Sequence, residues 1–232
     1  MKVAIVQPYL FPYIGYFQLI NAVDKFVLFD DVNYIKRGWI NRNNILVSGK
    51  SHLFSIPLKE ASQNKRINEL ELSAETKWKG VLLKTIELNY KNAQQFETVF
   101  PVVKNIIDFD EPRLNIFIQN SIEVLVNYLE IKTEIIKSSS VYNNQNLKGA
   151  ERIAHVCKQE TADIYVNPIG GMEIYNKDFF AEKGISLKFL KSRNINYPQF
   201  KNDFVSWLSI IDVMMFNTPE KISELLNEYD FV

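Results

Sequence analysis

Hydrophobic residues at the start of the chain follow the pattern of one strand, one helix and a second strand. Val3 to Val6 is a short continuous apolar run, and Phe26 to Phe29 is another. Between them, apolar residues recur at helical spacing, which predicts a helix over Gly15 to Val23. We therefore expect two parallel strands joined by a right-handed crossover, with ligands bound beyond the carboxyl ends of the strands.

The remaining apolar pattern predicts a β-hairpin, a helical segment and further alternation of strands and helices. Two apolar runs flank the turn signal Ser48-Gly49-Lys50, and residues 76–129 are mostly helical in pattern. This order predicts one α/β domain over 1–232, a doubly wound and mostly parallel sheet in which 46–130 form an inserted hairpin and helical cover. Further expected strands are Ile67–Leu72, Glu134–Lys137, Asp163–Val166 and Ser186–Leu190, and further expected helices are Gly149–Lys158, Asp203–Phe216 and Pro219–Tyr229.

Composition narrows the classes of partner and site. The 27 Lys and Arg residues balance 27 Asp and Glu residues, which does not favour a broad nucleic-acid surface. No apolar run reaches membrane-spanning length, and Pro8 interrupts the first one, so we expect no membrane span and a cytoplasmic protein. The single Cys157 excludes an intramolecular disulfide, and with only two histidines we expect no metal site.

Candidate binding residues follow the first predicted strand. The loop from Gln7 to Tyr16 holds two prolines and several aromatics, and Gly15 permits close approach near the start of the helix. We expect Gln7, Tyr9 and Tyr16 to bind substrate. The alternative is that this loop is a hydrophobic plug that anchors the first helix.

Two adjacent carboxylates follow the second predicted strand. Asp30 and Asp31 should point to opposite faces if the strand continues, so that one of them faces the site. A carboxylate at a strand end can bind a hydroxyl or an amine, or accept a proton during group transfer. We expect these residues to be catalytic, and helix capping or a salt bridge to Lys36 or Arg37 is the alternative.

A cluster of bases, carboxamides and aromatics comes next. Arginine forks grip phosphate at two points, tryptophan stacks on a base, and carboxamides read polar edges. A nucleotide diphosphate would satisfy this set, whereas a solvated, charged hairpin is the plain alternative. The expected substrate-binding residues here are Asn33, Lys36, Arg37, Trp39, Asn41 and Arg42.

Four later features complete the candidates. His52 lies on a predicted strand just after the basic cluster, where a neutral imidazole could act as a base. Tyr197 follows a predicted strand exit and is expected to bind substrate. Asp212 lies on an apolar helix, where a buried acid needs a partner. Gly170-Gly171 permits close backbone approach but matches no phosphate-loop motif.

The chain resembles the WbqC-like family of bacterial polysaccharide-cluster proteins over nearly its whole length. Members of this family resemble acyltransferases, often labelled glycine transferases, in clusters that build surface polysaccharides such as O-antigen. The resemblance rests on Gln7-Pro8-Tyr9, Pro12, Gly15-Tyr16-Phe17, Asp30-Asp31-Val32, Tyr34, Lys36 to Trp39 and Asn41-Arg42-Asn43, with weaker matches at Ile56-Pro57, Arg152, Tyr165, Gly170-Gly171, Tyr175, Tyr197, Gln199 and Ser209 to Asp212.

The resemblance implies transfer of a glycyl or other acyl group to the amine of a nucleotide-linked amino sugar. We expect no tightly bound cofactor, and an acyl donor linked to phosphopantetheine on an acyl carrier protein. The first loop also resembles nucleotidyltransferase (HUP-like) folds, although Tyr13 and Tyr16 flank Ile14-Gly15 where those folds carry two histidines. Nucleotidyl transfer to a small substrate and non-catalytic binding of a nucleotide sugar remain the alternative functions.

Overall fold

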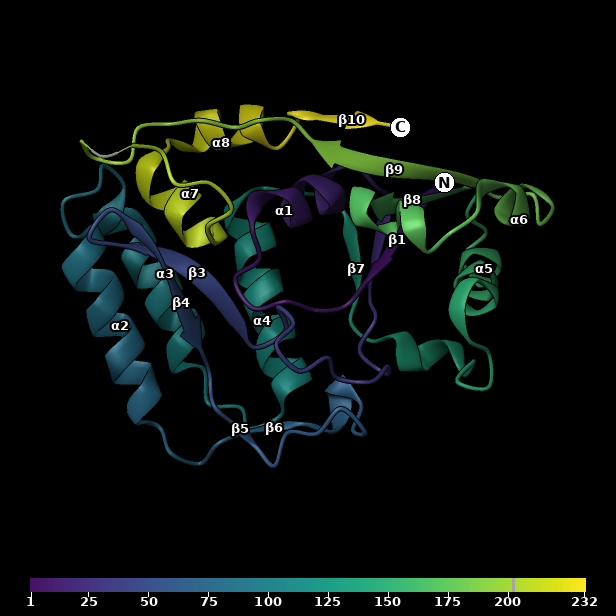
Figure 1. Cartoon of the computed structure of the whole chain (residues 1–232), viewed down its shortest axis with the longest axis horizontal. Helices are drawn as coiled ribbons and strands as arrows, with labels where there is room; N and C mark the ends of the chain where they lie inside the picture. The colour runs from purple at the N-terminus through teal and green to yellow at the C-terminus, as the bar shows by residue number, and fades with distance from the viewer. Residues whose placement is uncertain (202) are drawn as a thin grey trace.

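The computed structural model describes residues 1–201 and 203–232 and is built around a six-stranded sheet (Figure 1). The strand order is β10-β9-β8-β1-β2-β7. All neighbouring pairs are parallel except β9 and β10, which are antiparallel. The strands are β1 (Lys2–Val6), β2 (Lys25–Leu28), β7 (Glu134–Ile136), β8 (Ile164–Pro168), β9 (Ser186–Ser192) and β10 (Tyr229–Phe231).

The strand order is that of a doubly wound sheet, which confirms the predicted fold class. Counted along the chain, the sheet strands follow the order third, second, first, fourth, fifth and sixth. The winding reverses between β1 and β8, and the parallel strands end at the same edge of the sheet. Ligands of such sheets bind in the crevice beyond that edge.

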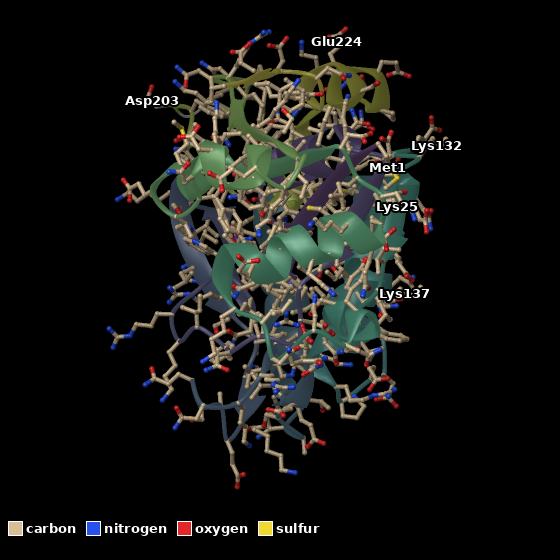
Figure 2. All side chains as sticks on the ribbon, turned by 90° about the vertical axis from the view of Figure 1, so that its right-hand side faces the viewer. Met1, Lys25, Lys132, Lys137, Asp203 and Glu224 are labelled. Carbon is tan, nitrogen blue, oxygen red and sulfur yellow. The ribbon has the colours of Figure 1, made fainter. Side chains whose placement is uncertain are left out.

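Alternating residues of the central strands face two different layers. Val3 and Ile5 pack in one cluster with α5 (Gly149–Gln159) and α6 (Lys177–Ala181), whereas Ala4 packs in the other with α1 (Ile14–Asn21) and α4 (Leu114–Tyr128). Viewed from the α5 side, this helix lies across the sheet (Figure 2). The start of α5 lies toward the carboxyl edge, because the chain leaves β7 at that edge and α5 carries it back to the start of β8, which runs in the same direction.

The segment between β2 and β7 forms the expected hairpin and helical cover, which lies on the α1 side of the sheet (Figure 1). The hairpin strands pair from Arg42 with Ser55 to Val47 with Lys50. Elements of this segment are β3 (Arg42–Val47), β4 (Lys50–Ser55), β5 (Leu58–Lys59), η1 (Ile67–Glu69), β6 (Glu71–Leu72), α2 (Lys77–Tyr90), α3 (Phe96–Asp108) and α4.

Three predicted elements differ from the structure. The strand expected over Ile67–Leu72 is the 3₁₀ turn η1 followed by β6, because the Glu69 carboxylate caps the turn by accepting from the Arg66 backbone N–H. The helix expected from Asp203 begins at Ile210 as α7 (Ile210–Phe216), where the Ser209 hydroxyl accepts from the Ile211 N–H. The last helix, α8 (Pro219–Leu225), ends early because the chain continues into β10.

The remaining connections are two further 3₁₀ turns, η2 (Ser139–Tyr142) and η3 (Ile169–Glu173). They follow β7 and β8 at the carboxyl edge of the sheet. Across residues 1–201 and 203–232, no helix combines the length and the apolar character needed to cross a membrane.

Candidate functional site

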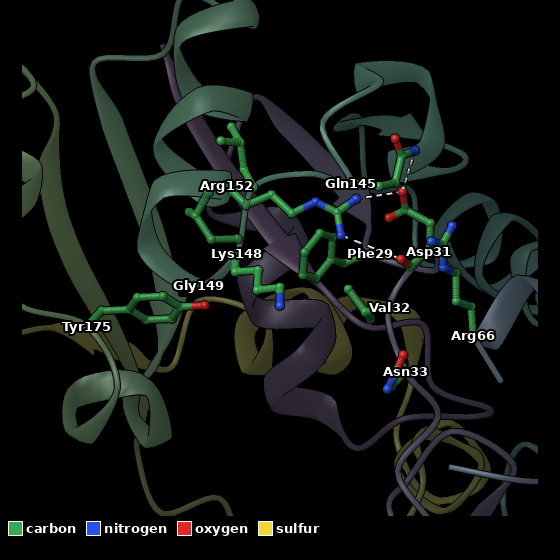
Figure 3. Close-up of a pocket in the computed structure, with 12 residues that line it drawn as sticks. Phe29, Asp31, Val32, Asn33, Arg66, Gln145, Lys148, Gly149, Arg152 and Tyr175 are labelled. Atoms are coloured by element: carbon green, nitrogen blue, oxygen red, sulfur yellow. Dashed lines mark hydrogen bonds and ion pairs between the residues drawn. The ribbon is translucent and has the colours of Figure 1, made fainter. Parts of the chain in front are cut away.

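A pocket of about 270 Å³ opens beyond the carboxyl end of β2 (Figure 3). Four segments line it: residues 29–33 after β2, Arg66 before η1, residues 145–153 at the start of α5, and Tyr175 after β8. Backbone bonds bring the Arg66 segment to the strand exit, because the Ile67 N–H donates to the Val32 carbonyl at 2.9 Å. The pocket therefore lies where the fold predicts a ligand site.

A buried ion pair between Asp31 and Arg152 forms one wall of the pocket (Figure 3). Arg152 Nη2 lies 2.5 Å from Asp31 Oδ2, and both side chains are less than a tenth exposed. Gln145 Nε2 donates to the same oxygen at 3.0 Å, and the Ser139 hydroxyl donates to Oδ1. The charge of Asp31 is therefore paired inside the fold.

Arg152 is held in place by two further contacts. Its Nε donates to Asn144 Oδ1 at 2.9 Å, and its guanidinium lies over the Phe29 ring, 4.8 Å from the centroid. A planar guanidinium suits such a site because it can stack on a ring while it donates in its own plane. Arg152 thus joins the start of α5 to the end of β2.

Asp30 does not line the pocket and lies in a polar cluster beside it, which shares Ser139 with Asp31. Its carboxylate accepts from Ser138 Oγ at 2.7 Å, Asn115 Nδ2 at 3.0 Å and the Ser139 N–H at 3.2 Å. Burial raises the pKa of Asp30, and these three donors act in the opposite direction. Of the two adjacent carboxylates, Asp31 lines the pocket and Asp30 does not.

Two cations line the pocket without a carboxylate partner. Among the residues that the structure describes, neither Arg66 nor Lys148 forms an ion pair. Lys148 is also the N-cap of α5, and because an ammonium group can only donate, its side chain cannot cap the first-turn N–H groups. Because the Asp31 charge is already paired, the pocket carries a positive charge that suits an anion.

The predicted residues of the first loop pack among themselves. Tyr16 is buried, and its hydroxyl donates to the Gln7 carbonyl at 3.0 Å. The Tyr9 ring lies 5.5 Å from the Tyr16 ring, and burial raises the pKa of both phenols. Gly15 is approached by the protein's own Tyr13, since a Cβ there would lie 2.2 Å from that ring. Gln7, Tyr9 and Tyr16 do not line the pocket. Their packing is the kind expected of a hydrophobic plug that anchors the first helix.

The predicted basic cluster divides into an exposed part and a structural part. Asn33 lines the pocket, whereas Lys36, Arg37 and Trp39 are exposed outside it. Asn41 is buried, where its Oδ1 accepts from Tyr34 and its Nδ2 donates to the Ile56 carbonyl, both at 2.8 Å. Arg42 Nε donates to the Gly38 carbonyl at 2.8 Å and so stabilises the preceding loop.

His52 and Tyr197 also lie apart from the pocket. His52 is exposed on β4, opposite Ile45 of the hairpin. The Tyr197 hydroxyl donates to buried Asp212 at 2.7 Å. Asp212 has the partners that a buried acid needs, because Tyr90 and Gln199 also donate to it, at 2.8 and 2.6 Å.

Sequence reasoning did not assign a role in the site to Arg66, Gln145, Lys148, Arg152 or Tyr175. One signal was present in the α5 sequence. Arg152 lies four residues before Val156, a helical spacing that places the arginine on the apolar face of the helix. A buried arginine requires an acid, and the acids after β2 were the available partners. In residues 1–201 and 203–232, no three His, Cys, Asp or Glu side chains come together as a metal site.

Comparisons with known proteins match nearly the whole chain to a family model and to a relative of similar length. A protein-family model described as the WbqC-like protein family matches residues 7–224. The uncharacterized protein Rv1507c of Mycobacterium tuberculosis (strain ATCC 25618 / H37Rv) is 28% identical over 228 residues, which covers 97% of each chain. No solved structure matches the chain.

Proposed function

Because this chain belongs to the WbqC-like protein family, we propose that it is an acyltransferase that acts on the amino group of a nucleotide-linked amino sugar. The activity is the one that the family resemblance implies, in the synthesis of surface polysaccharide. The pocket beside β2 is the proposed site.

One observation carries the proposal: the start of α5 and two cations that form no ion pair within residues 1–201 and 203–232 converge on the pocket. Arg66 and Lys148 supply positive charge, and the first-turn amides of α5 are donors without a side-chain cap. A diphosphate offers two charges and several acceptor oxygens to such a set. Asn33 and Tyr175 add polar groups at the rim that could bind sugar hydroxyls.

The reaction needs a neutral amine and an activated acyl group. The amine nitrogen attacks the carbonyl carbon of a thioester, the C–N bond forms, the C–S bond breaks, and the thiol leaves with the proton. Asp31 is the carboxylate among the residues that line the pocket, but its side chain is 1% exposed and already accepts from Arg152, Gln145 and Ser139. We therefore assign Asp31 to hold the Arg152 guanidinium in the pocket wall, as a positioning residue that does not touch the amine. Phosphopantetheine is the proposed donor arm.

The test is an assay of amide formation. The protein is incubated with uridine or deoxythymidine diphosphate amino sugars and a glycyl thioester, and mass spectrometry follows the added acyl group. Replacing Arg66 and Lys148 together with alanine should raise the KM for the nucleotide sugar about ten-fold. The exposed pair Lys84 and Lys91, changed in the same way, is the matched control. Absence of N-acyl product with several plausible donor and acceptor pairs would refute the proposal.

The strand order favours nucleotidyl transfer as a second candidate. Doubly wound sheets of this order bind nucleotides at the edge where the pocket lies. That reaction releases pyrophosphate from a nucleoside triphosphate, whereas acyl transfer releases a thiol. A coupled pyrophosphate assay alongside a free-thiol assay separates the two activities in one set of incubations.

A further inference from the structure

An exposed loop beside the pocket combines unpaired cations with uncovered apolar side chains. We define the basic loop as residues 35–39, Ile35 to Trp39. Ile35 is 54% exposed and Trp39 is 44% exposed, and Lys36 and Arg37 are exposed between them. No ion pair among the described residues involves either cation. Large apolar side chains left in water next to free charges are typical of a surface that a partner covers.

The basic loop is held in one shape by Arg42. Its Nε donates to the Gly38 carbonyl at 2.8 Å, a second guanidinium nitrogen donates to the Arg37 carbonyl, and the guanidinium lies over the Trp39 ring. The Gly38 N–H closes the turn on the Ile35 carbonyl at 3.0 Å. Arg37 lies in the left-handed region, with φ of 62°, a strained conformation for a residue other than glycine. A surface fixed in advance loses less conformational freedom when it binds.

The basic loop is continuous with the rim of the pocket. Asn33, two residues before it, lines the pocket and forms a β-bridge with Arg66. The Tyr34 N–H donates to the Lys65 carbonyl at 2.9 Å. A partner seated on the loop would therefore have one edge at the pocket mouth.

We propose that the basic loop is the docking surface for an acidic acyl carrier protein, which presents its thioester-linked arm to the pocket. This inference rests on the proposed function, since acyl transfer from a carrier needs such a surface. Charge complementarity favours an acidic protein, because the loop itself contains two cations and no acid. A protein partner also covers Ile35 and Trp39. The chain has no net charge, and two cations are fewer than the phosphate contacts typical of nucleic-acid binding.

The test measures direct binding of a purified bacterial acyl carrier protein in its apo form, by calorimetry at low and at physiological salt. Reversing both charges, in the variant Lys36→Glu with Arg37→Glu, should weaken binding about ten-fold or more. The control reverses the same number of charges on and beyond α2, in Lys84→Glu with Lys91→Glu, and should change the affinity less than about two-fold. Trp39→Ala should weaken binding in both salts, because its contribution is apolar.

A kinetic arm separates this inference from the proposed function. The charge-reversed loop should raise the KM for the carrier-linked thioester at least about ten-fold more than the KM for the same acyl group on free pantetheine. Equal carrier affinity in wild type and the loop variant would overturn the docking surface, even if both proteins form product. Absence of product with every donor would instead refute acyl transfer, and the binding data would still decide the surface. The proposed docking surface would also be overturned by a different pattern of binding. In that pattern the wild type binds vesicles with anionic lipid, the loop variant does not, and neither binds the carrier protein.

Discussion

Removing Arg152 should leave Asp31 as an uncompensated charge inside the fold. The substitution Arg152→Met keeps the apolar stem of the side chain but deletes the guanidinium. The lost contacts are the 2.5 Å ion pair with Asp31, the bond to Asn144 and the stacking on Phe29. Because the Asp31 side chain is 1% exposed, water cannot replace the lost partner without opening the structure.

The magnitude follows from what remains around the carboxylate. Breaking a buried pair by removing one partner costs about 3–5 kcal/mol. Gln145 and Ser139 continue to donate to Asp31, which favours the lower end, about 3 kcal/mol. For a chain of this size, 1 kcal/mol shifts the Tm by about 2–4 °C. The expected loss is therefore about 6–12 °C.

Urea unfolding followed by circular dichroism measures the free energy of unfolding. The exposed Lys158 of the same helix, changed to methionine, is the control and should lose less than about 1 kcal/mol. The double variant Asp31→Asn with Arg152→Met should regain at least about half of the loss, because the buried charge is removed as well. A loss below about 1 kcal/mol in the single variant, or no recovery in the double variant, would show that the pair is not a buried charge pair.

Three further changes test other parts of the structure. Gly15→Ala should cost about 1–3 kcal/mol in thermal unfolding, because its Cβ would lie 2.2 Å from the Tyr13 ring; an unchanged Tm would contradict this contact. Gly80 lies on α2, and a Cβ added there would meet no neighbouring atom within 4 Å. Gly80→Ala should therefore raise the free energy of unfolding by about 1 kcal/mol, and a lower value would contradict this reasoning. Arg113 holds the pKa of Glu111 at about 2, below the ordinary 4.5, so its stabilisation is present above pH 4.5 and lost as pH falls toward 2. Glu111→Gln should therefore lower stability at pH 7 by up to about 1 kcal/mol, and urea titrations should show the difference vanish near pH 2.

The sequence was sufficient for the fold class because hydrophobic periodicity is a local signal. The alternation from Val3 to Phe29 predicts two strands and a helix, and the polar residues after the second strand include Asp31. Edge strand β10 was not predicted, since three residues carry too little pattern to tell a strand from the end of a helix. Residues 203–208 show an apolar pattern but do not form a helix. The helix α7 begins only after Ser209, whose side chain caps it.

The candidate site was predicted only in the part that lies next to β2. The cations Arg66 and Lys148 line the same pocket as Asp31, and no hydrophobic periodicity connects positions so far apart in the chain. The aromatic loop from Gln7 to Tyr16 was expected to bind substrate, but the structure places it outside the pocket, with Tyr16 buried against Gln7. Aromatic loops serve packing and binding equally well, and only the surrounding elements distinguish the two uses.

The distance along the chain between the two ends of the Asp31–Arg152 pair governs when the pocket can form. These residues are 121 positions apart, and the last lining residue, Tyr175, comes later still. Contacts between distant segments form after local helices and hairpins, since a long loop must close first. On a chain growing on the ribosome, the full lining of the pocket is therefore present only after Tyr175 has emerged. A complete pocket thus shows that the sheet has closed from β2 to β8, and a product truncated before β8 would lack one wall of it.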